Sequence, residues 1–353
     1  MAGATIYDVA TAAGVSIKTV SRVVNGEPNV SPALKERVDK AVADLGYRRS
    51  LSARSLAGAS SSIIAALVDA ELTIEHWRSG RGNDYLSRLE LGALMEVRQA
   101  DYHLMVELVD HASPTLQRDL SALIASIRPA GVLLTPPNSD HSVVLDVLDA
   151  AGVAYARIGS EKELHRGVNV SMDERSAARD MTLHLIELGH RRIGFVTGPV
   201  TYAASQRRLQ GFRDAMAAHD LEIAASAIAE GDFTFPSGVS GAERILDAVP
   251  DVTAIFASND DTALGVLQAA RARGLKTPDD LSVAGFDDTP SAMFSTPALT
   301  TIRQPVAEMA AAAARRLTPV LSAGLPADEA GQVVIVPYAL VVRDSTGAPP
   351  IRS

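Results

Sequence analysis

A short segment near the N-terminus carries residue types that could read the edges of DNA bases. Val20, Val23 and Val24 have the spacing of one buried helix face, so the remaining side chains of this helix point outward. An outward arginine such as Arg22 can donate two hydrogen bonds to a guanine, which discriminates against a wrong base by about 1–3 kcal/mol. We therefore expect base recognition from the outward set Ile17, Lys18, Thr19, Ser21 and Arg22.

Three short helices must position this set. Thr5 and Asp8 have capping-box spacing and begin the first helix, which Gly14 ends because glycine tolerates a left-handed turn. The recognition segment follows that turn, and Ser31-Pro32 begins a third helix that runs to Leu45-Gly46. This pattern predicts a helix-turn-helix domain whose second helix lies in the major groove. The alternative is a small three-helix packing module that does not contact DNA.

The charge of the chain is unevenly distributed. Residues 1–58 contain eight Lys and Arg against five Asp and Glu, a balance of +3, whereas the whole chain has a formal net charge of −9. A basic head on an acidic body can present the head to DNA while the body is repelled. The balance is small, so it supports the helix-turn-helix without deciding it.

The rest of the chain shows the alternation of strand-like and helical segments that is typical of an α/β protein. Residues 63–68 form a continuous apolar run, as expected for a buried parallel strand, and further strand-like runs alternate with helical segments. This alternation predicts a doubly wound parallel architecture, in which ligands bind at the carboxyl ends of the strands. The further strands are expected near 102–108, 131–135, 153–158, 192–197, 253–257 and 281–286.

Polar side chains follow several of these expected strands. Asn259-Asp260-Asp261 and Phe286-Asp287-Asp288 each come directly after a strand, and the turn after 192–197 leads to Ser205 and Arg208. Carboxylates, an amide and an arginine in a fixed array suit a polyhydroxylated ligand. Two acids beside a cleft are also compatible with a glycosidase pair drawn from Asp260, Asp261 and Asp287.

Other chemistries find no support in the sequence. The chain has no cysteine, so it has no disulfide and no thiolate metal site, and it shows no Ser/His/Asp order, phosphate loop or paired-histidine zinc motif. We therefore expect no catalytic residues, no metal and no cofactor. Neither a secretory signal nor a stretch of about 18 apolar residues is present. We expect no membrane association and a cytoplasmic location.

The head closely resembles that of the lactose-repressor (LacI/GalR) family. The resemblance rests on the segments TIYDVA from Thr5, AGVS from Ala13, TVSRVVN from Thr19, and the stretch from Val30-Ser31 to Leu45-Gly46-Tyr47. It implies major-groove contacts from Ile17, Lys18 and Arg22. It also implies phosphate contacts from Tyr7, Ser16, Thr19, Ser21 and Asn25.

Residues 50–58 resemble the hinge helix of that family. The resemblance implies that Leu56 inserts into the minor groove, where an apolar wedge unstacks a base step and bends the duplex. The chain departs from the family at Arg49-Ser50, where Pro-Asn is usual; Ser50 can still cap a helix, and the missing proline favours a looser hinge. The alternative is a flexible linker.

The body resembles the effector core of the same family, which is similar to periplasmic sugar-binding proteins with two lobes and a cleft. The matching segments are GHRRIGFV, RLQGF, GDF, ASND, SVAGFDD and PALTTIRQ, starting at Gly189, Arg208, Gly231, Ala257, Ser282 and Pro297. The resemblance implies that Arg208, Asn259 and Asp287 bond ligand hydroxyls and that Phe233 stacks on the ligand. Tyr85 takes the place of an aromatic residue on the opposite lobe.

Alternatives remain open for some of these residues. Phe233 and Tyr85 could be core residues, and Asp287 could cap a loop. Residues 69–82, which include the only tryptophan, form a longer segment than usual and could flank the cleft or be a surface loop. Gly159 stands where some sugar-binding members have an acid.

Together these interpretations predict a DNA-binding domain at 1–49, a hinge at 50–61, an effector-binding and dimerisation domain at 62–345, and a tail at 346–353. The N-lobe is expected to combine about 62–158 with 292–322, and the C-lobe about 159–291 with 323–345. The predicted protein is a homodimeric repressor that binds pseudo-palindromic double-stranded operator DNA under the control of a small effector, a sugar or sugar derivative. The alternatives are a sugar-binding protein without a DNA role and a glycoside-acting enzyme.

Overall fold

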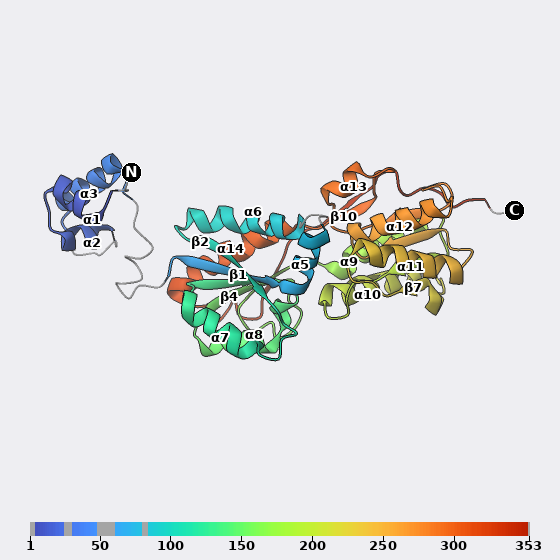
Figure 1. Ribbon diagram of the computed structural model, residues 1–353, viewed down its shortest axis with the longest axis horizontal. Coiled ribbons are helices and arrows are strands. Elements are labelled where there is room, and N and C mark those ends of the chain that lie inside the picture. Colours follow the sequence, from blue (N-terminus) through green and yellow to red (C-terminus); the bar gives the residue numbers. More distant parts are fainter. Residues whose placement is uncertain (1–3, 25–29, 48–60, 80–83, 352–353) are drawn as a thin grey trace. The chain divides into compact units, whose positions relative to one another are not determined.

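The computed structural model describes residues 4–24, 30–47, 61–79 and 84–351 of the 353-residue chain (Figure 1). The chain forms two compact units, Met1–Ser62 and Ile63–Ser353. No helix among these described ranges is long and apolar enough to cross a lipid bilayer.

The first unit contains three helices, α1 (Ile6–Ala13), α2 (Ile17–Val24) and α3 (Pro32–Leu45). Thr5 and Asp8 form the expected capping box at the start of α1, and Gly14 ends that helix with a φ of 60°. Val9, Val20 and Val38 come from the three helices and are each fully buried in a shared small core. The capping and spacing signals in the sequence therefore place all three helices correctly.

The second unit contains a six-stranded parallel sheet in the order β11-β5-β4-β3-β1-β2, which we call the N-lobe sheet. Helices α7 and α8 pack on one of its faces, and α6 and α14 pack on the other (Figure 1). A Cβ at Gly92 of α6 would lie 2.0 Å from the Ala307 carbonyl oxygen, so glycine allows α6 and α14 to approach closely. The bounds are β1 (Ile63–Asp69), α5 (Ala70–Ser79), α6 (Asp84–Gln99), β2 (His103–Val109), α7 (Leu116–Ile127), β3 (Gly131–Leu134), η1 (Asn138–Asp140), α8 (Ser142–Ala150), β4 (Ala154–Ile158), β5 (Val168–Ser171), α14 (Val306–Ala323) and β11 (Val333–Ile335).

A four-stranded parallel sheet in the order β7-β6-β8-β9 forms the C-lobe. Helices α9 and α10 pack on one face, where Phe195, Phe212 and Phe256 are buried, and α11 and α12 pack on the other. A separate antiparallel pair joins β10 to β12. The bounds are α9 (Glu174–Glu187), β6 (Ile193–Val196), α10 (Ala203–Ala218), η2 (Ala225–Ala227), β7 (Ile228–Ala229), α11 (Phe235–Ala248), β8 (Ala254–Ala257), α12 (Asp260–Ala272), β9 (Ser282–Ala284), α13 (Pro290–Phe294), β10 (Thr301–Arg303) and β12 (Ala339–Val341).

The structure corrects the expected division into lobes. Strands β5 and β11 lie in the N-lobe sheet, although 159–291 and 323–345 were assigned to the C-lobe. Ala292 and Leu299 pack in the C-lobe core, although 292–322 was assigned to the N-lobe. The strand β5 has the sequence Val-Asn-Val-Ser, so no continuous apolar run predicts it. Its polar residue Asn169 can be buried because it accepts a hydrogen bond from the Ser160 hydroxyl and donates one to the Leu164 carbonyl.

The longer segment at 69–82 contains a helix. Strand β1 continues directly into α5, and the backbone N–H of Glu71 donates to the Asp69 carboxylate at the junction (3.2 Å). The structure therefore shows helix rather than loop for residues 70–79 of this segment. Its inner residues Leu72, Thr73 and His76 contribute to the wall of the cavity described next.

Candidate functional site

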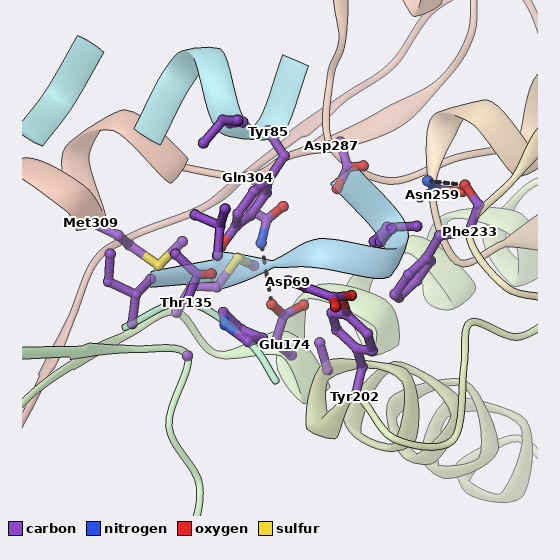
Figure 2. Close-up of a pocket in the computed structure, with 18 of the residues that line it drawn as sticks. Asp69, Tyr85, Thr135, Glu174, Tyr202, Phe233, Asn259, Asp287, Gln304 and Met309 are labelled. Atoms are coloured by element: carbon purple, nitrogen blue, oxygen red, sulfur yellow. Dashed lines mark hydrogen bonds between the residues drawn. The ribbon is translucent and has the colours of Figure 1, made fainter. Parts of the chain in front are cut away.

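A cavity of about 1020 Å³, including the part that opens to solvent, lies where the carboxyl ends of the strands of both lobes meet (Figure 2). Asp69, Thr135 and Ser171 stand at or just after the ends of β1, β3 and β5. Phe233, Asn259 and Asp287 follow β7, β8 and β9 in the C-lobe. Further lining comes from Tyr85 and Leu86 of α6, Glu174 of α9, Tyr202, Ala204 and Arg208 at the start of α10, and Gln304 and Met309.

Arg208 is the central charged residue of the cavity wall and is only 4% exposed. Its Nε donates to the Glu174 carboxylate at 2.7 Å, and its Nη1 donates to the Ser258 carbonyl at 2.6 Å. The guanidinium lies over the Phe286 ring, 3.6 Å from its centroid. A buried guanidinium with a carboxylate partner forms a rigid donor fork, which suits a fixed binding site.

Asp287 extends into the same space from a loop with an unusual backbone. Its φ of 116° lies in the region that favours glycine, and Asp288 follows at 56°. Arg88 of α6 holds this loop by donating to the carbonyls of Asp287 and Asp288. Burial raises the pKa of the Asp287 carboxyl well above its ordinary value, and Arg208, 3.9 Å away, opposes that rise. A loop held in a sparsely populated conformation is typical of a ligand site.

Aromatic side chains supply the apolar part of the wall. Phe233 packs edge-to-face against Tyr202, with 5.5 Å between the ring centroids. The Tyr202 hydroxyl donates to the Asp69 carboxylate at 2.5 Å and so joins α10 of the C-lobe to the end of β1 in the N-lobe. Burial and the charge of Asp69 raise the pKa of Tyr202, so this phenol stays protonated. Aromatic faces beside polar groups are the surface that a sugar ring requires.

The surface of α2 in the first unit is polar, as its sequence predicts. Val20 and Val23 point into the helical core, whereas Lys18 and Arg22 are exposed and Ile17 is 42% exposed. Ser16 and Thr19 share a hydrogen bond of 2.9 Å at the start of the helix. Of the other predicted contacts, Tyr7 is exposed and Ser21 half-buried, while Asn25, Leu56 and the hinge at 50–58 lie outside the described residues.

Comparison with known proteins matches both units. Residues 5–50 match the model for bacterial regulatory proteins of the lacI family, and residues 182–346 match a periplasmic binding protein-like domain. The chain is 34% identical to the HTH-type transcriptional regulator CelR of Thermobifida fusca, across 89% of this chain and 90% of that protein. It belongs to the lacI family.

Solved structures of family members agree with this assignment. A CelR–cellobiose complex is 31% identical, with a TM-score of 0.73 and coverage of 97% of this chain and 99% of that one. The lac repressor dimer bound to operator and an anti-inducer is 27% identical, with a TM-score of 0.78 and coverage of 98% and 100%. The predicted family and fold class are therefore confirmed, and this lacI-family protein is a DNA-binding transcription regulator with an effector-binding domain.

The structure brings together most of the effector residues predicted for this lacI-family regulator. Tyr85, Arg208, Phe233, Asn259 and Asp287 all line the cavity. The amide of Asn259 also serves the fold, because it donates to the Phe233 carbonyl and its oxygen caps α12. Ser205 is buried in α10 and is not among the lining residues.

Sequence reasoning missed several lining residues, including Asp69, Glu174, Tyr202 and Gln304. Asp69 ends the first apolar run, so the strand-end criterion applied there would have found it. Glu174 and Gln304 follow β5 and β10, which are too short and too polar to predict as strands. Gly159 does line the cavity, and the neighbouring acid Glu161 lines it as well.

One of the three acids considered for a glycosidase pair, Asp260, has a structural role. Asp260 is fully buried, and its carboxylate accepts hydrogen bonds from Thr301 and from the backbone and hydroxyl of Thr289. Burial raises the pKa of Asp260 to about 7. Such a carboxylate organises the loop that carries Asp287 and cannot contact a glycoside.

Proposed function

We propose that this regulator is a repressor that binds pseudo-palindromic operator DNA as a homodimer, and that a sugar in the cavity controls its operator affinity. The observation that carries the proposal is the strand-end cavity, in which the aromatic rings of Tyr85, Tyr202 and Phe233 lie among the polar groups of Arg208 and Asp287. The CelR relative has been solved as a cellobiose complex, which supports a sugar for this site.

The proposed division of labour follows the expected domains. Residues 1–49 bind DNA with the contacts named above, the hinge at 50–61 transmits the effector state, and 62–345 binds the effector and dimerises. Because its target is chromosomal DNA, we place the protein in the cytoplasm. The relatives are regulators, and we propose that the chain has no catalytic activity and uses no cofactor.

A thermal-shift screen of mono- and disaccharides, with cellobiose among them, tests the effector. A ligand that binds only the folded state at 100 times its Kd should add about 2.7 kcal/mol to the stability, which raises the melting temperature by several degrees. Each stabilising sugar is then added to an operator-binding assay, where we expect it to change the affinity at least tenfold. If no carbohydrate shifts the melting temperature, the sugar assignment is wrong.

The dimer is proposed from an exposed apolar surface in the second unit. Leu91 and Met95 of α6 are 59% and 56% exposed, and Phe294 of α13 is 79% exposed. Arg88 connects the two elements, because it lies on α6 and donates to the carbonyl of Asp288, just before α13. Exposed large apolar side chains indicate a protein interface where they gather on one element, as Leu91 and Met95 do one turn apart on α6, and a two-fold operator requires two heads.

Replacing both Leu91 and Met95 by lysine should convert the dimer to a monomer, because two buried charges would face their symmetry copies across the interface. Size-exclusion chromatography with light scattering measures the mass, and operator affinity should fall with it. Ile335→Lys is the control, since Ile335 is equally exposed but lies on β11, at the sheet edge opposite β2. If the double variant remained a dimer, α6 would not form part of the interface.

A further inference from the structure

The described wall of the effector cavity has an excess of negative charge. Four lining carboxylates, those of Asp69, Glu161, Glu174 and Asp287, face one lining arginine, Arg208, and one histidine, His76, and the described lining contains no lysine. Such an imbalance bears on the charge of the molecule that the cavity accepts, because electrostatic interactions are strong where water is excluded.

The one lining arginine is already neutralised. The Glu174 carboxylate receives the Nε of Arg208 at 2.7 Å, and the Ser258 carbonyl receives its Nη1. Asp287 stands 3.9 Å from the same guanidinium. A ligand phosphate or carboxylate that paired with Arg208 would compete with Glu174 for the charge of the guanidinium.

Arginines close to the cavity are also occupied. Arg207 pairs with Glu161 at 2.6 Å. Arg88 pairs with Asp84 at 2.6 Å and donates to the backbone carbonyls of Asp287 and Asp288. Neither guanidinium is therefore available to an anion without the loss of an existing ion pair.

Helix N-termini, which ordinarily attract anions, are blocked by acids at two points of the cavity wall. Glu174 lies in the first turn of α9, and Asp260 and Asp261 lie in the first turn of α12. The first turn of α10, which includes the lining residue Ala204, carries no acid. Of these three helix starts, only that of α10 lacks an acid.

The pKa of Asp287 responds first to burial and then to the neighbouring charges. Burial raises the pKa of its carboxyl, and the charges of Asp260, Glu174 and Asp261 raise it further against the opposing effect of Arg208. The neighbouring carboxylates that contribute to this shift lie beside the same part of the cavity wall and disfavour a further negative charge there.

We propose that the cavity selects effectors without negative charge: it takes a neutral or amine-bearing polyhydroxylated molecule and rejects the phosphorylated or carboxylated form of the same sugar. This inference rests on the proposed function and narrows its ligand class. Glu174 and Asp287 act as hydrogen-bond acceptors for hydroxyl or ammonium groups and thereby determine specificity.

Calorimetric titration of the full chain with charge-matched sugars tests the proposal. The sets are glucose, glucosamine, glucuronate and glucose 6-phosphate; the galactose counterparts; and cellobiose with cellobionate. Within the set that binds, we expect the anionic members to bind at least about tenfold more weakly, the scale of one like-charge contact in a partly buried site. An anionic member that binds as tightly as the neutral one overturns the inference and leaves the sugar assignment intact. If no member of any set binds, while the wider screen also finds no carbohydrate, the proposed function fails and the inference fails with it.

Glu174→Gln tests the physical cause, because it frees Arg208 while nearly preserving shape. The ratio of anionic to neutral affinity should rise at least threefold, whereas Glu187→Gln, an exposed change at the other end of α9, should leave it unchanged. Glu161→Gln, which frees Arg207 instead, provides a second variant if the first does not fold. An unchanged ratio in the folded variants overturns the assignment of specificity to these carboxylates.

Discussion

Arg208→Ala should abolish effector binding and lower the free energy of unfolding of the α/β unit by about 3–5 kcal/mol. The loss of stability and the loss of effector binding both follow from removal of the guanidinium. The guanidinium is the partner of Glu174 and stands near Asp287, so its removal leaves buried carboxylates without a compensating charge. It also removes the donor fork that we propose for the ligand hydroxyls, and the contact with the Phe286 ring.

Urea denaturation followed by tryptophan fluorescence measures the stability, since Trp77 of α5 is the only tryptophan and reports on this unit. Arg213→Ala is the matched control, because Arg213 also lies on α10 but is exposed and is not among the lining residues. Arg208→Lys should restore part of the stability and little of the binding, because lysine keeps the charge and loses the planar fork. Normal effector affinity in Arg208→Ala would show that Arg208 does not bind the effector.

Arg22→Ala should abolish specific operator binding and leave effector binding intact. A bidentate arginine–guanine contact is worth about 1–3 kcal/mol, and a dimer makes it twice, so the expected loss is roughly 30-fold to 20,000-fold in affinity. Arg22 is exposed on α2, opposite the buried Val20 and Val23, so its removal should not disturb the helical core.

Fluorescence anisotropy with an operator enriched from random DNA measures this loss, and a scrambled duplex measures the non-specific background. Binding to the scrambled duplex should change little, since it depends on total charge rather than on one base contact. Lys40→Ala removes an exposed charge from α3 and is the control for charge alone. Unchanged discrimination between operator and scrambled DNA in Arg22→Ala would show that α2 does not read bases through this residue.

The helices of the first unit could be located from the sequence because their signals are local. The Thr5–Asp8 capping box, the left-handed glycines Gly14 and Gly46, and the valine spacing of α2 each act within a few residues. The strongest strands β1, β3 and β8 were predicted for a similar reason, since each is a continuous apolar run. The same logic identified Asn259 and Asp287 as strand-end residues.

The membership of each lobe and part of the site required the tertiary structure. Strand β11 pairs with β5, more than 160 residues away in the chain, and neither strand has a pattern that predicts its partner. Glu174 and Gln304 could not be assigned to the cavity until β5 and β10 were placed.

The sequence by itself therefore determined the helical head, the outward face of α2, the α/β class and five of the residues that line the cavity. Only the tertiary structure decided which strand ends meet, that α5 forms part of the wall, and that Arg208 is already paired with Glu174. The physical reason is that helix caps, turns and apolar periodicity depend on residues that are close together in the sequence. Strand pairing and the balance of charge in a cavity depend on residues that only folding brings together.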